Sequence, residues 1–126
     1  MQVKIYYHDT DAGGVVYYAN YLKFLEEART EFFASRGISI KDLTLQGTLF
    51  VVARQEIDYK SPAFYGDILD VGAAISNTSA VRVEFEHEIK NQNKQLVVKA
   101  KTTLVCVDKN LKPKAIPEEI VAKIKR

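Results

Sequence analysis

The sequence has very little cysteine, tryptophan or proline. Among its 126 residues there are one cysteine, no tryptophan and three prolines. The single thiol, Cys106, excludes an internal disulfide and a zinc cluster built on cysteines. Because only two histidines accompany it, we expect no metal site of the kind that zinc hydrolases use.

Long hydrophobic runs are also missing. No stretch approaches the ~20 apolar residues that cross a bilayer. The first residues, Met-Gln-Val-Lys-Ile-Tyr-Tyr-His, lack the apolar core of a signal peptide. We therefore expect a cytoplasmic protein that is not inserted in a membrane.

Neither sign of charge dominates. The chain has 18 Lys and Arg against 16 Asp and Glu, a net charge of +2. A dedicated nucleic-acid binder usually has a much stronger basic bias, so we expect no nucleic-acid partner. The basic residues that gather from Lys109 onward either keep the protein soluble or attract a phosphate-bearing ligand. With 47% apolar residues, one domain over residues 1–126 has enough material for a core.

One segment has helical periodicity, and most of the rest alternates as strands do. Residues 18–35 predict a long amphipathic helix that ends before Gly37. Its expected apolar stripe consists of Leu22, Leu25, Ala28 and Phe32, widened by Tyr21 and Phe24. Strands are predicted over residues 3–7, 51–59, 68–75, 82–89 and 95–107. Pro117, followed by two acidic residues, predicts the start of a short terminal helix.

Alternation also predicts which strand residues face inward. In residues 51–59 they are Val51, Ala53, Ile57 and Tyr59, and in residues 82–89 they are Val83, Phe85, His87 and Ile89. Consecutive strands with short loops favour an antiparallel sheet, and the long helix is the only large element able to cover it. We predict an α+β fold in which a five-stranded antiparallel sheet wraps around one long central helix. Open sheet edges favour dimerisation.

The segment of residues 9–21 contains the best candidate for chemistry. Asp9 and Asp11 lie in a tight loop that leads through Gly13 and Gly14 into the start of the long helix. Glycines let a ligand approach the backbone closely, and a helix start offers free N–H groups. The pattern therefore indicates a carboxylate beside an oxyanion-stabilising site. The alternative is that each aspartate only caps a turn or the helix.

This segment resembles the signature of the 4-hydroxybenzoyl-CoA thioesterase family, and most closely its bacterial acyl-CoA thioesterases of the Tol-Pal-associated branch. The matching residues are Tyr7, Asp9, Thr10, Asp11, Gly14, Val15, Val16, Tyr17, Asn20, Tyr21, Leu22, Glu27, Ala28, Arg29, Glu31 and Phe32. The resemblance implies the hot-dog fold and hydrolysis of short-chain acyl or aryl CoA esters. It also implies a homo-oligomer, a dimer or a dimer of dimers. No cofactor is implied, because CoA arrives with the substrate.

The resemblance also implies particular roles for residues. Asp11 matches the catalytic carboxylate, which acts as nucleophile or general base, and the main-chain N–H of Tyr18 matches the oxyanion donor. The Tol-Pal-associated branch commonly has His at the position of Tyr18, whereas the aryl-CoA branch has Tyr there. Substrate contacts are expected at Gly14, Val15 and Val16. For the CoA phosphates, charge and the family's outward placement of the nucleotide indicate Arg54, Arg82, Lys112 and Lys114.

Other residues and functions stay as alternatives. Glu27 is the fallback carboxylate, since another hot-dog branch uses an acid on the central helix. His8 is interpreted as a loop residue, and His87 and Cys106 as packed core residues. A hot-dog dehydratase or hydratase pairs a His with a helix carboxylate. A non-catalytic acyl-CoA or acyl-carrier-protein binding module would need no base at all.

Overall fold

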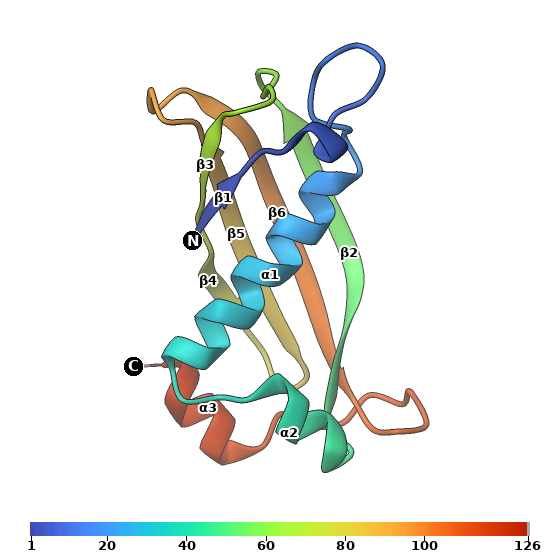
Figure 1. The fold of residues 1–126 in the computed structure, drawn as a ribbon. Coiled ribbons are helices and arrows are strands. Elements are labelled where there is room, and N and C mark those ends of the chain that lie inside the picture. The colour runs from blue at the N-terminus through green and yellow to red at the C-terminus, as the bar shows by residue number, and fades with distance from the viewer. Residues whose placement is uncertain (126) are drawn as a thin grey trace.

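The computed structural model describes residues 1–125. One long helix, α1 (Asn20–Ser35), crosses one face of a sheet diagonally (Figure 1). Two short helices, α2 (Ile40–Leu45) and α3 (Glu118–Ile124), lie at the lower end, while the loop that precedes α1 stands at the upper end (Figure 1). The strands are β1 (Gln2–Lys4), β2 (Leu49–Tyr59), β3 (Ile68–Val71), β4 (Ala74–Thr78), β5 (Arg82–Lys90) and β6 (Leu96–Val107). The expected α+β sheet wrapped around one central helix is thus present.

The sheet of the described chain has six strands instead of the five expected. Its order is β1-β3-β5-β6-β2, with β4 paired to β5. The single strand predicted over residues 68–75 is wrong, because it is broken at Gly72 and Ala73 into β3 and β4. The Gly72 N–H donates to the carbonyl oxygen of Glu88 at 2.8 Å. A Cβ at position 72 would meet that oxygen at 3.3 Å, so the break depends on a residue without a side chain.

A bulge in β2 changes which of its residues face the core. Val52 pairs with Leu104 and Arg54 with Thr103, so that Ala53 is the extra residue. The prediction that Val51 and Ala53 point inward is therefore wrong. Because their partners Cys106 and Leu104 are buried, Phe50 and Val52 are the residues before the bulge that lie on the α1 side of the sheet, although Val52 is 53% exposed. After the bulge, the residues on that side are Gln55, Ile57 and Tyr59.

Helix α1 buries a wide stripe against the sheet. Its buried residues are Tyr21, Phe24, Leu25, Ala28, Arg29 and Phe33. The predicted stripe is confirmed at four of these positions, but Leu22 is 43% exposed and Phe32 only partly buried. The chain leaves the helix through Gly37, whose φ of +75° favours glycine.

The two ends of the molecule have separate cores. The upper core packs α1 against β3, β5 and β6 around Leu25, Leu69 and Ile89. The lower core is built around Phe33 and Phe85 and includes residues of α2 and α3. The predicted terminal helix is confirmed as α3, with Pro117 as its N-cap residue. Helix α2 has too few residues to show a clear period and was not predicted.

The first strand is shorter than predicted. Strand β1 ends at Lys4, and a 3-10 turn follows at Tyr7–Asp9. The Asp9 carboxylate accepts the Tyr6 N–H at 2.9 Å, which holds the chain in this turn. The expectation of a strand over residues 3–7 is therefore wrong in its second half.

Candidate active site

The carboxylate pair lies on a tight hairpin at the upper end of α1. Thr10 and Val16 form an antiparallel bridge, and the Asp11 N–H donates to the Val15 carbonyl at 2.9 Å. The turn closes where the Gly14 N–H donates to the Asp11 carbonyl at 3.0 Å. Gly14 has a φ of +83°, and no atom lies within 4 Å of the place that a Cβ would take, so its backbone faces open space.

Asp11 is exposed, and its carboxylate is held by one main-chain contact. Its Oδ1 accepts the Gly13 N–H at 2.8 Å, which leaves most of its acceptor capacity open. A Cβ at Gly13 would lie 3.2 Å from that oxygen, so glycine gives the carboxylate its room. The geometry leaves Asp11 able to attack an electrophile or to take a proton from water.

Asp9 is engaged by the fold. Besides its carboxylate contact with Tyr6, its carbonyl oxygen accepts the Tyr17 N–H and the Asn20 side-chain Nδ2, each at 2.9 Å. Both carboxylates thus accept a local main-chain N–H, as the capping alternative expects, Asp9 from Tyr6 and Asp11 from Gly13. Asp11 has the freer carboxylate of the two.

The start of α1 presents unpaired donors. In the described chain, the main-chain N–H groups of Tyr18 and Ala19 donate to no protein acceptor. The two residues form the corner between the hairpin and the helix, closed by the Asn20 N–H on the Tyr17 carbonyl at 2.9 Å. Free donors at a helix start suit the negative oxygen of a tetrahedral intermediate.

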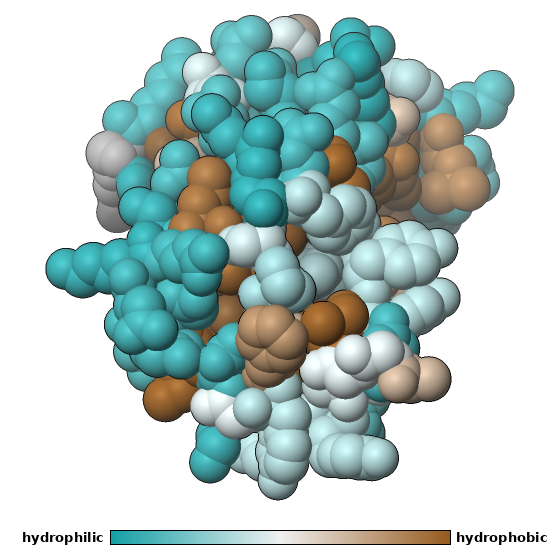
Figure 2. All heavy atoms as spheres, turned by 90° about the horizontal axis from the view of Figure 1, so that it is seen from above, coloured by the Kyte–Doolittle hydropathy of each residue, from teal (hydrophilic) through white to brown (hydrophobic). Residues whose placement is uncertain are grey.

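Aromatic side chains surround this corner. The rings of Tyr18 and Tyr59 meet edge to face at 6.1 Å, and the Tyr59 hydroxyl donates to the Tyr18 carbonyl at 3.4 Å. Burial raises the pKa of Tyr59 above its usual value. The large apolar or aromatic residues exposed at the same end are Tyr6, Tyr7, Tyr17, Phe64 and Tyr65. Figure 2 shows pale and brown side chains gathered on one part of this end, beside a teal hydrophilic part.

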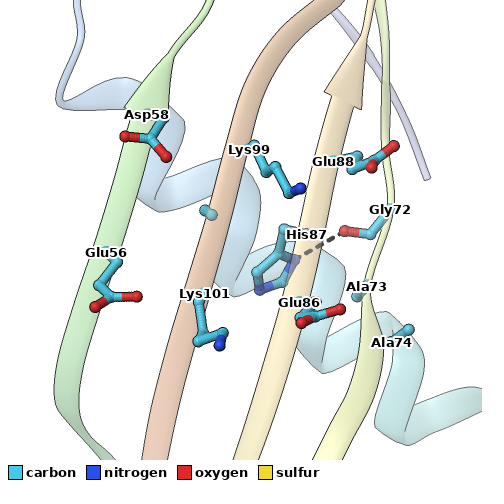
Figure 3. A pocket seen from close by; sticks show the side chains of 11 residues that line it. Glu56, Asp58, Gly72, Ala73, Ala74, Glu86, His87, Glu88, Lys99 and Lys101 are labelled. Atoms are coloured by element: carbon cyan, nitrogen blue, oxygen red, sulfur yellow. Dashed lines mark hydrogen bonds between the residues drawn. The ribbon is translucent and has the colours of Figure 1, made fainter.

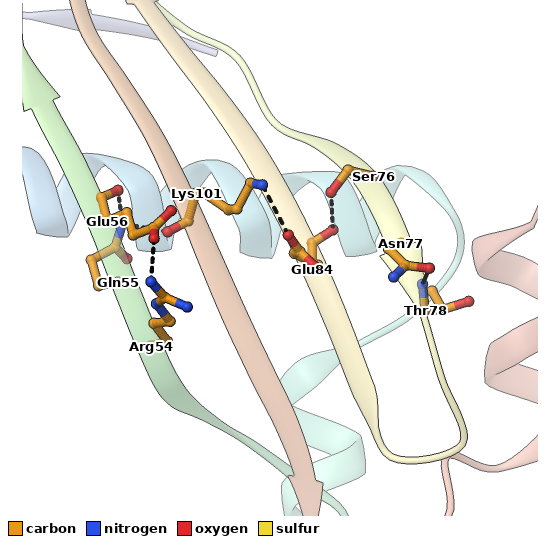
Figure 4. A network of polar contacts seen from close by, with 8 residues as sticks. All are labelled: Arg54, Gln55, Glu56, Ser76, Asn77, Thr78, Glu84 and Lys101. Atoms are coloured by element: carbon orange, nitrogen blue, oxygen red, sulfur yellow. Dashed lines mark hydrogen bonds and ion pairs between the residues drawn. The ribbon is translucent and has the colours of Figure 1, made fainter.

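The four residues expected at the CoA phosphates fall into two groups. Arg54 and Arg82 line one hollow of about 580 Å³ on the face of the sheet away from α1. Arg54 is paired there with Glu56, and neighbouring Lys101 with Glu84 (Figure 4). The structure does not place this group in the hairpin that carries Asp11.

Lys112 and Lys114 follow β6 in the chain, and they lie near the start of β2, at the end of that strand away from Tyr59. The Lys114 ammonium donates to the Thr48 hydroxyl at 2.8 Å, just before β2 begins. Tyr59, which contacts Tyr18, ends the same strand. An 11-residue strand spans roughly 33 Å, so within one chain these lysines lie far from Asp11.

Gly14, Val15 and Val16 lie close to Asp11 in the hairpin but differ in exposure and in main-chain hydrogen bonding. Gly14 is exposed, whereas the Val16 side chain is 4% exposed and its N–H donates to the Ala63 carbonyl at 2.9 Å. The Val15 carbonyl is the acceptor for Asp11 described above. Substrate contacts by these residues stay a prediction, and Gly14 has the most accessible backbone of the three.

His87 is buried in a polar network under α1. Its Nδ1 contacts the Gly72 carbonyl at 2.8 Å and its Nε2 lies 3.4 Å from Arg29 Nη1. Burial, together with the nearby guanidinium, lowers the pKa of His87 from 6.5 to about 4. Arg29 also donates to Thr102 at 3.2 Å. His87 edges a hollow of about 550 Å³ on the outer sheet face, among Glu86, Glu88 and two lysines (Figure 3).

The remaining candidates are placed as packed or solvated residues. Cys106 is fully buried, and burial raises the pKa of its thiol. His8 and Glu27 are exposed. Within residues 1–125, no group of three or more His, Cys, Asp or Glu is placed to hold a metal ion. None of the helices in that range is both long and apolar enough to cross a membrane.

The fold and the family of this chain are those of thioesterases. A 1,4-dihydroxy-2-naphthoyl-CoA thioesterase from Synechocystis superposes with a TM-score of 0.91 at 28% identity, covering 99% of this chain and 93% of that one. The family model of the thioesterase-like superfamily matches residues 6–124, and the chain belongs to this family.

Two similar sequences are named as enzymes of the same class. The Escherichia coli O6:H1 acyl-CoA thioester hydrolase YbgC is 38% identical over 125 residues, 98% of this chain and 93% of its own length. The Haemophilus influenzae acyl-CoA thioesterase YbgC is 39% identical over 122 residues, 95% and 89% of the two chains. The hot-dog fold and the thioesterase class expected from the motif are thereby confirmed.

Several residues that shape the site were not predicted from the sequence. The contacts of Asn20 with the Asp9 carbonyl and of Tyr59 with the Tyr18 carbonyl were not expected, whereas Gly13 is one of the two loop glycines that the sequence singles out. Asn20 belongs to the matched motif, which was the one signal for it. Arg29 occupies a helix position four residues from both Leu25 and Phe33, and a charged residue within an apolar stripe signals a buried polar network.

Proposed function

We propose that the protein hydrolyses acyl-CoA thioesters to a free acid and CoA, with Asp11 as nucleophile or general base. The main-chain N–H of Tyr18 is the proposed oxyanion donor. One observation carries the proposal: an exposed, lightly bonded carboxylate shares a hairpin with unpaired N–H groups at a helix start. A thioester has a good leaving group, so this pair of functions suffices for the reaction.

Two routes fit this geometry. In the first, Asp11 removes a proton from water, the oxygen adds to the thioester carbon, and the C–S bond breaks to release CoA thiolate, which is then protonated. In the second, an Asp11 oxygen attacks the carbon and expels CoA thiolate, leaving a mixed anhydride that water hydrolyses. The carbonyl oxygen is negative in both tetrahedral intermediates, where a fixed N–H donor stabilises it most.

The acyl group is proposed to be short-chain or aromatic. The exposed rings of Tyr17, Tyr18 and Tyr59 border the corner with the free N–H groups. Flat aromatic walls offer stacking and edge contacts to an aryl group and apolar contact to a short chain. The naphthoyl-CoA specificity named for the Synechocystis structure is consistent with the aromatic option.

The CoA phosphates are proposed to contact one of the two basic groups. Double substitution Arg54→Gln with Arg82→Gln tests the outer sheet face, and Lys112→Gln with Lys114→Gln tests the far end of β2. The correct pair raises KM for the CoA ester by about tenfold for roughly 1.4 kcal/mol of lost contact. A pair that leaves KM unchanged is removed from the proposal.

A dehydratase or hydratase is the weaker alternative. That chemistry pairs a histidine with a helix carboxylate, yet His87 bonds Gly72 and Arg29, and His8 contacts Asp9 in the loop. A non-catalytic acyl-binding module is the other alternative. It requires no free carboxylate, and the exposure of Asp11 favours catalysis over it.

The test is thiol release from acetyl-, butyryl-, hexanoyl-, palmitoyl-, benzoyl- and 4-hydroxybenzoyl-CoA. We expect Asp11→Asn to lower kcat by at least about 10³-fold with an unchanged fold, because the amide is neither base nor nucleophile. The matched control Glu27→Gln, an exposed carboxylate on α1, retains kcat. An active Asp11→Asn or an inactive Glu27→Gln contradicts the assignment. Label from ¹⁸O water in the Asp11 carboxylate after one turnover distinguishes the anhydride route.

A further inference from the structure

The corner formed by Tyr18 and Ala19 is held from both sides by one acceptor. The carbonyl oxygen of Asp9 receives the Tyr17 N–H and the Asn20 Nδ2, each at 2.9 Å. These donors belong to the residues immediately before and after the corner. A third contact, from the Asn20 N–H to the Tyr17 carbonyl at 2.9 Å, closes the corner itself.

The Tyr17 N–H and the Asn20 side chain join different parts of the structure to the Asp9 carbonyl. The Tyr17 contact belongs to the main-chain ladder of the hairpin and persists with any side chain. The Asn20 contact is the only side-chain bond among the described residues between α1 and the strand of the hairpin that carries Asp11. It therefore ties the first turn of α1, which directly follows the free N–H groups, to the strand that carries Asp11.

We propose that Asn20 is a positioning residue for hydrolysis, which aligns the Tyr18 N–H with the thioester oxygen while Asp11 engages the carbon. This inference rests on the proposed function. Asn20 touches neither reacting atom in this role; it acts through the Asp9 carbonyl. A donor aimed at the developing oxyanion gains its value from fixed geometry, and small displacements at a reacting centre lower the rate steeply.

A structural role and a positioning role of Asn20 predict different effects of its replacement. Replacing Asn20, the first residue of α1, by alanine removes one side-chain hydrogen bond and leaves the main-chain contacts of the corner in place. A merely structural Asn20 would thus be replaced at little cost to the enzyme. A positioning Asn20 would leave substrate binding nearly intact and slow the chemical step, because its effect is felt in the transition state.

The experiment compares Asn20→Ala and Asn20→Asp with the wild type on the fastest CoA ester of the panel. Aspartate keeps the shape but cannot donate to the Asp9 carbonyl when ionised. We expect both to lower kcat by about 10- to 100-fold with KM within threefold and thermal midpoints near that of the wild type. The matched control Ser35→Ala removes a side-chain bond to the Phe32 carbonyl at the other end of α1, and its kcat stays unchanged.

Each outcome has one meaning. Wild-type kcat in both Asn20 variants, with Asp11→Asn inactive, overturns the positioning role and leaves the proposed function standing. A kcat loss that tracks a lowered thermal midpoint also overturns it, since stability alone then explains the effect. If no ester is hydrolysed, or Asp11→Asn stays active, the proposed function fails and this inference fails with it.

Discussion

Gly13 matters at the scale of single residues because its missing side chain makes room for Asp11. A Cβ there would lie 3.2 Å from Asp11 Oδ1, while the backbone φ lies outside the range that only glycine favours. We predict that Gly13→Ala rotates the carboxylate, lowers kcat about tenfold and changes stability little. Steady-state kinetics and a thermal melt measure the two effects.

Gly37 provides the opposite case and hence the control. It has a φ of +75° and open space around it, at the far end of α1. Gly37→Ala should lower the free energy of unfolding by about 1 kcal/mol and leave kcat unchanged. If Gly13→Ala is as active as the wild type, the carboxylate does not depend on the space that Gly13 provides.

At the scale of secondary-structure elements, the buried contact between α1 and the sheet makes the free energy of unfolding depend on pH. Arg29 of α1 and neutral His87 of β5 share a buried contact, and the pKa of His87 is lowered from 6.5 to about 4, chiefly by burial. Between those pH values the unfolded chain binds the proton and the folded chain does not. The contribution of His87 to stability is therefore constant above about pH 6.5 and is lost as pH falls toward 4, by at most about 3 kcal/mol.

Urea unfolding at several pH values between 7 and 4 measures this loss. His87→Gln keeps an acceptor for Arg29 and a donor for Gly72 but does not titrate, so its stability should fall less over the same range. His8→Gln, at an exposed position, should behave as the wild type does. Equal pH dependence in the wild type and His87→Gln would remove His87 as the source.

The sequence predicted an element well where the pattern that forms it lies within the element itself, and poorly where the cause is a contact with a distant strand. Strand β5 and α1 were predicted well because their patterns act residue by residue. The bulge at Ala53 and the break at Gly72 arise from pairing with β6 and β5, which no local period contains. The motif places the proposed site at Asp11 and Tyr18, and this assignment stays a prediction. The contact of Asn20 with the Asp9 carbonyl depends on how the loop folds back onto α1, which the motif does not contain.

At the scale of the whole molecule, the open edge of the sheet is the feature on which we base a prediction of assembly. In the described chain, β2 pairs with β6 alone, so one side of an 11-residue strand without proline stays unpaired. A long unpaired edge favours pairing with a second copy. Antiparallel pairing centred on Gln55 places each Arg54 opposite a Glu56, so the charges of the strand complement themselves. We predict a dimer through β2.

Charge exchange tests this pairing and its register together. Glu56→Arg sets two pairs of like charges across the dimer axis, at ~1 kcal/mol each, so association should weaken by roughly thirtyfold. The double variant Arg54→Glu with Glu56→Arg restores opposite charges and should recover the dimer. Sedimentation velocity over a concentration series measures both. A monomeric wild type contradicts the dimer, and a dimer unaffected by Glu56→Arg contradicts this register, because opposed arginines at the centre of the edge cannot be neutral to association.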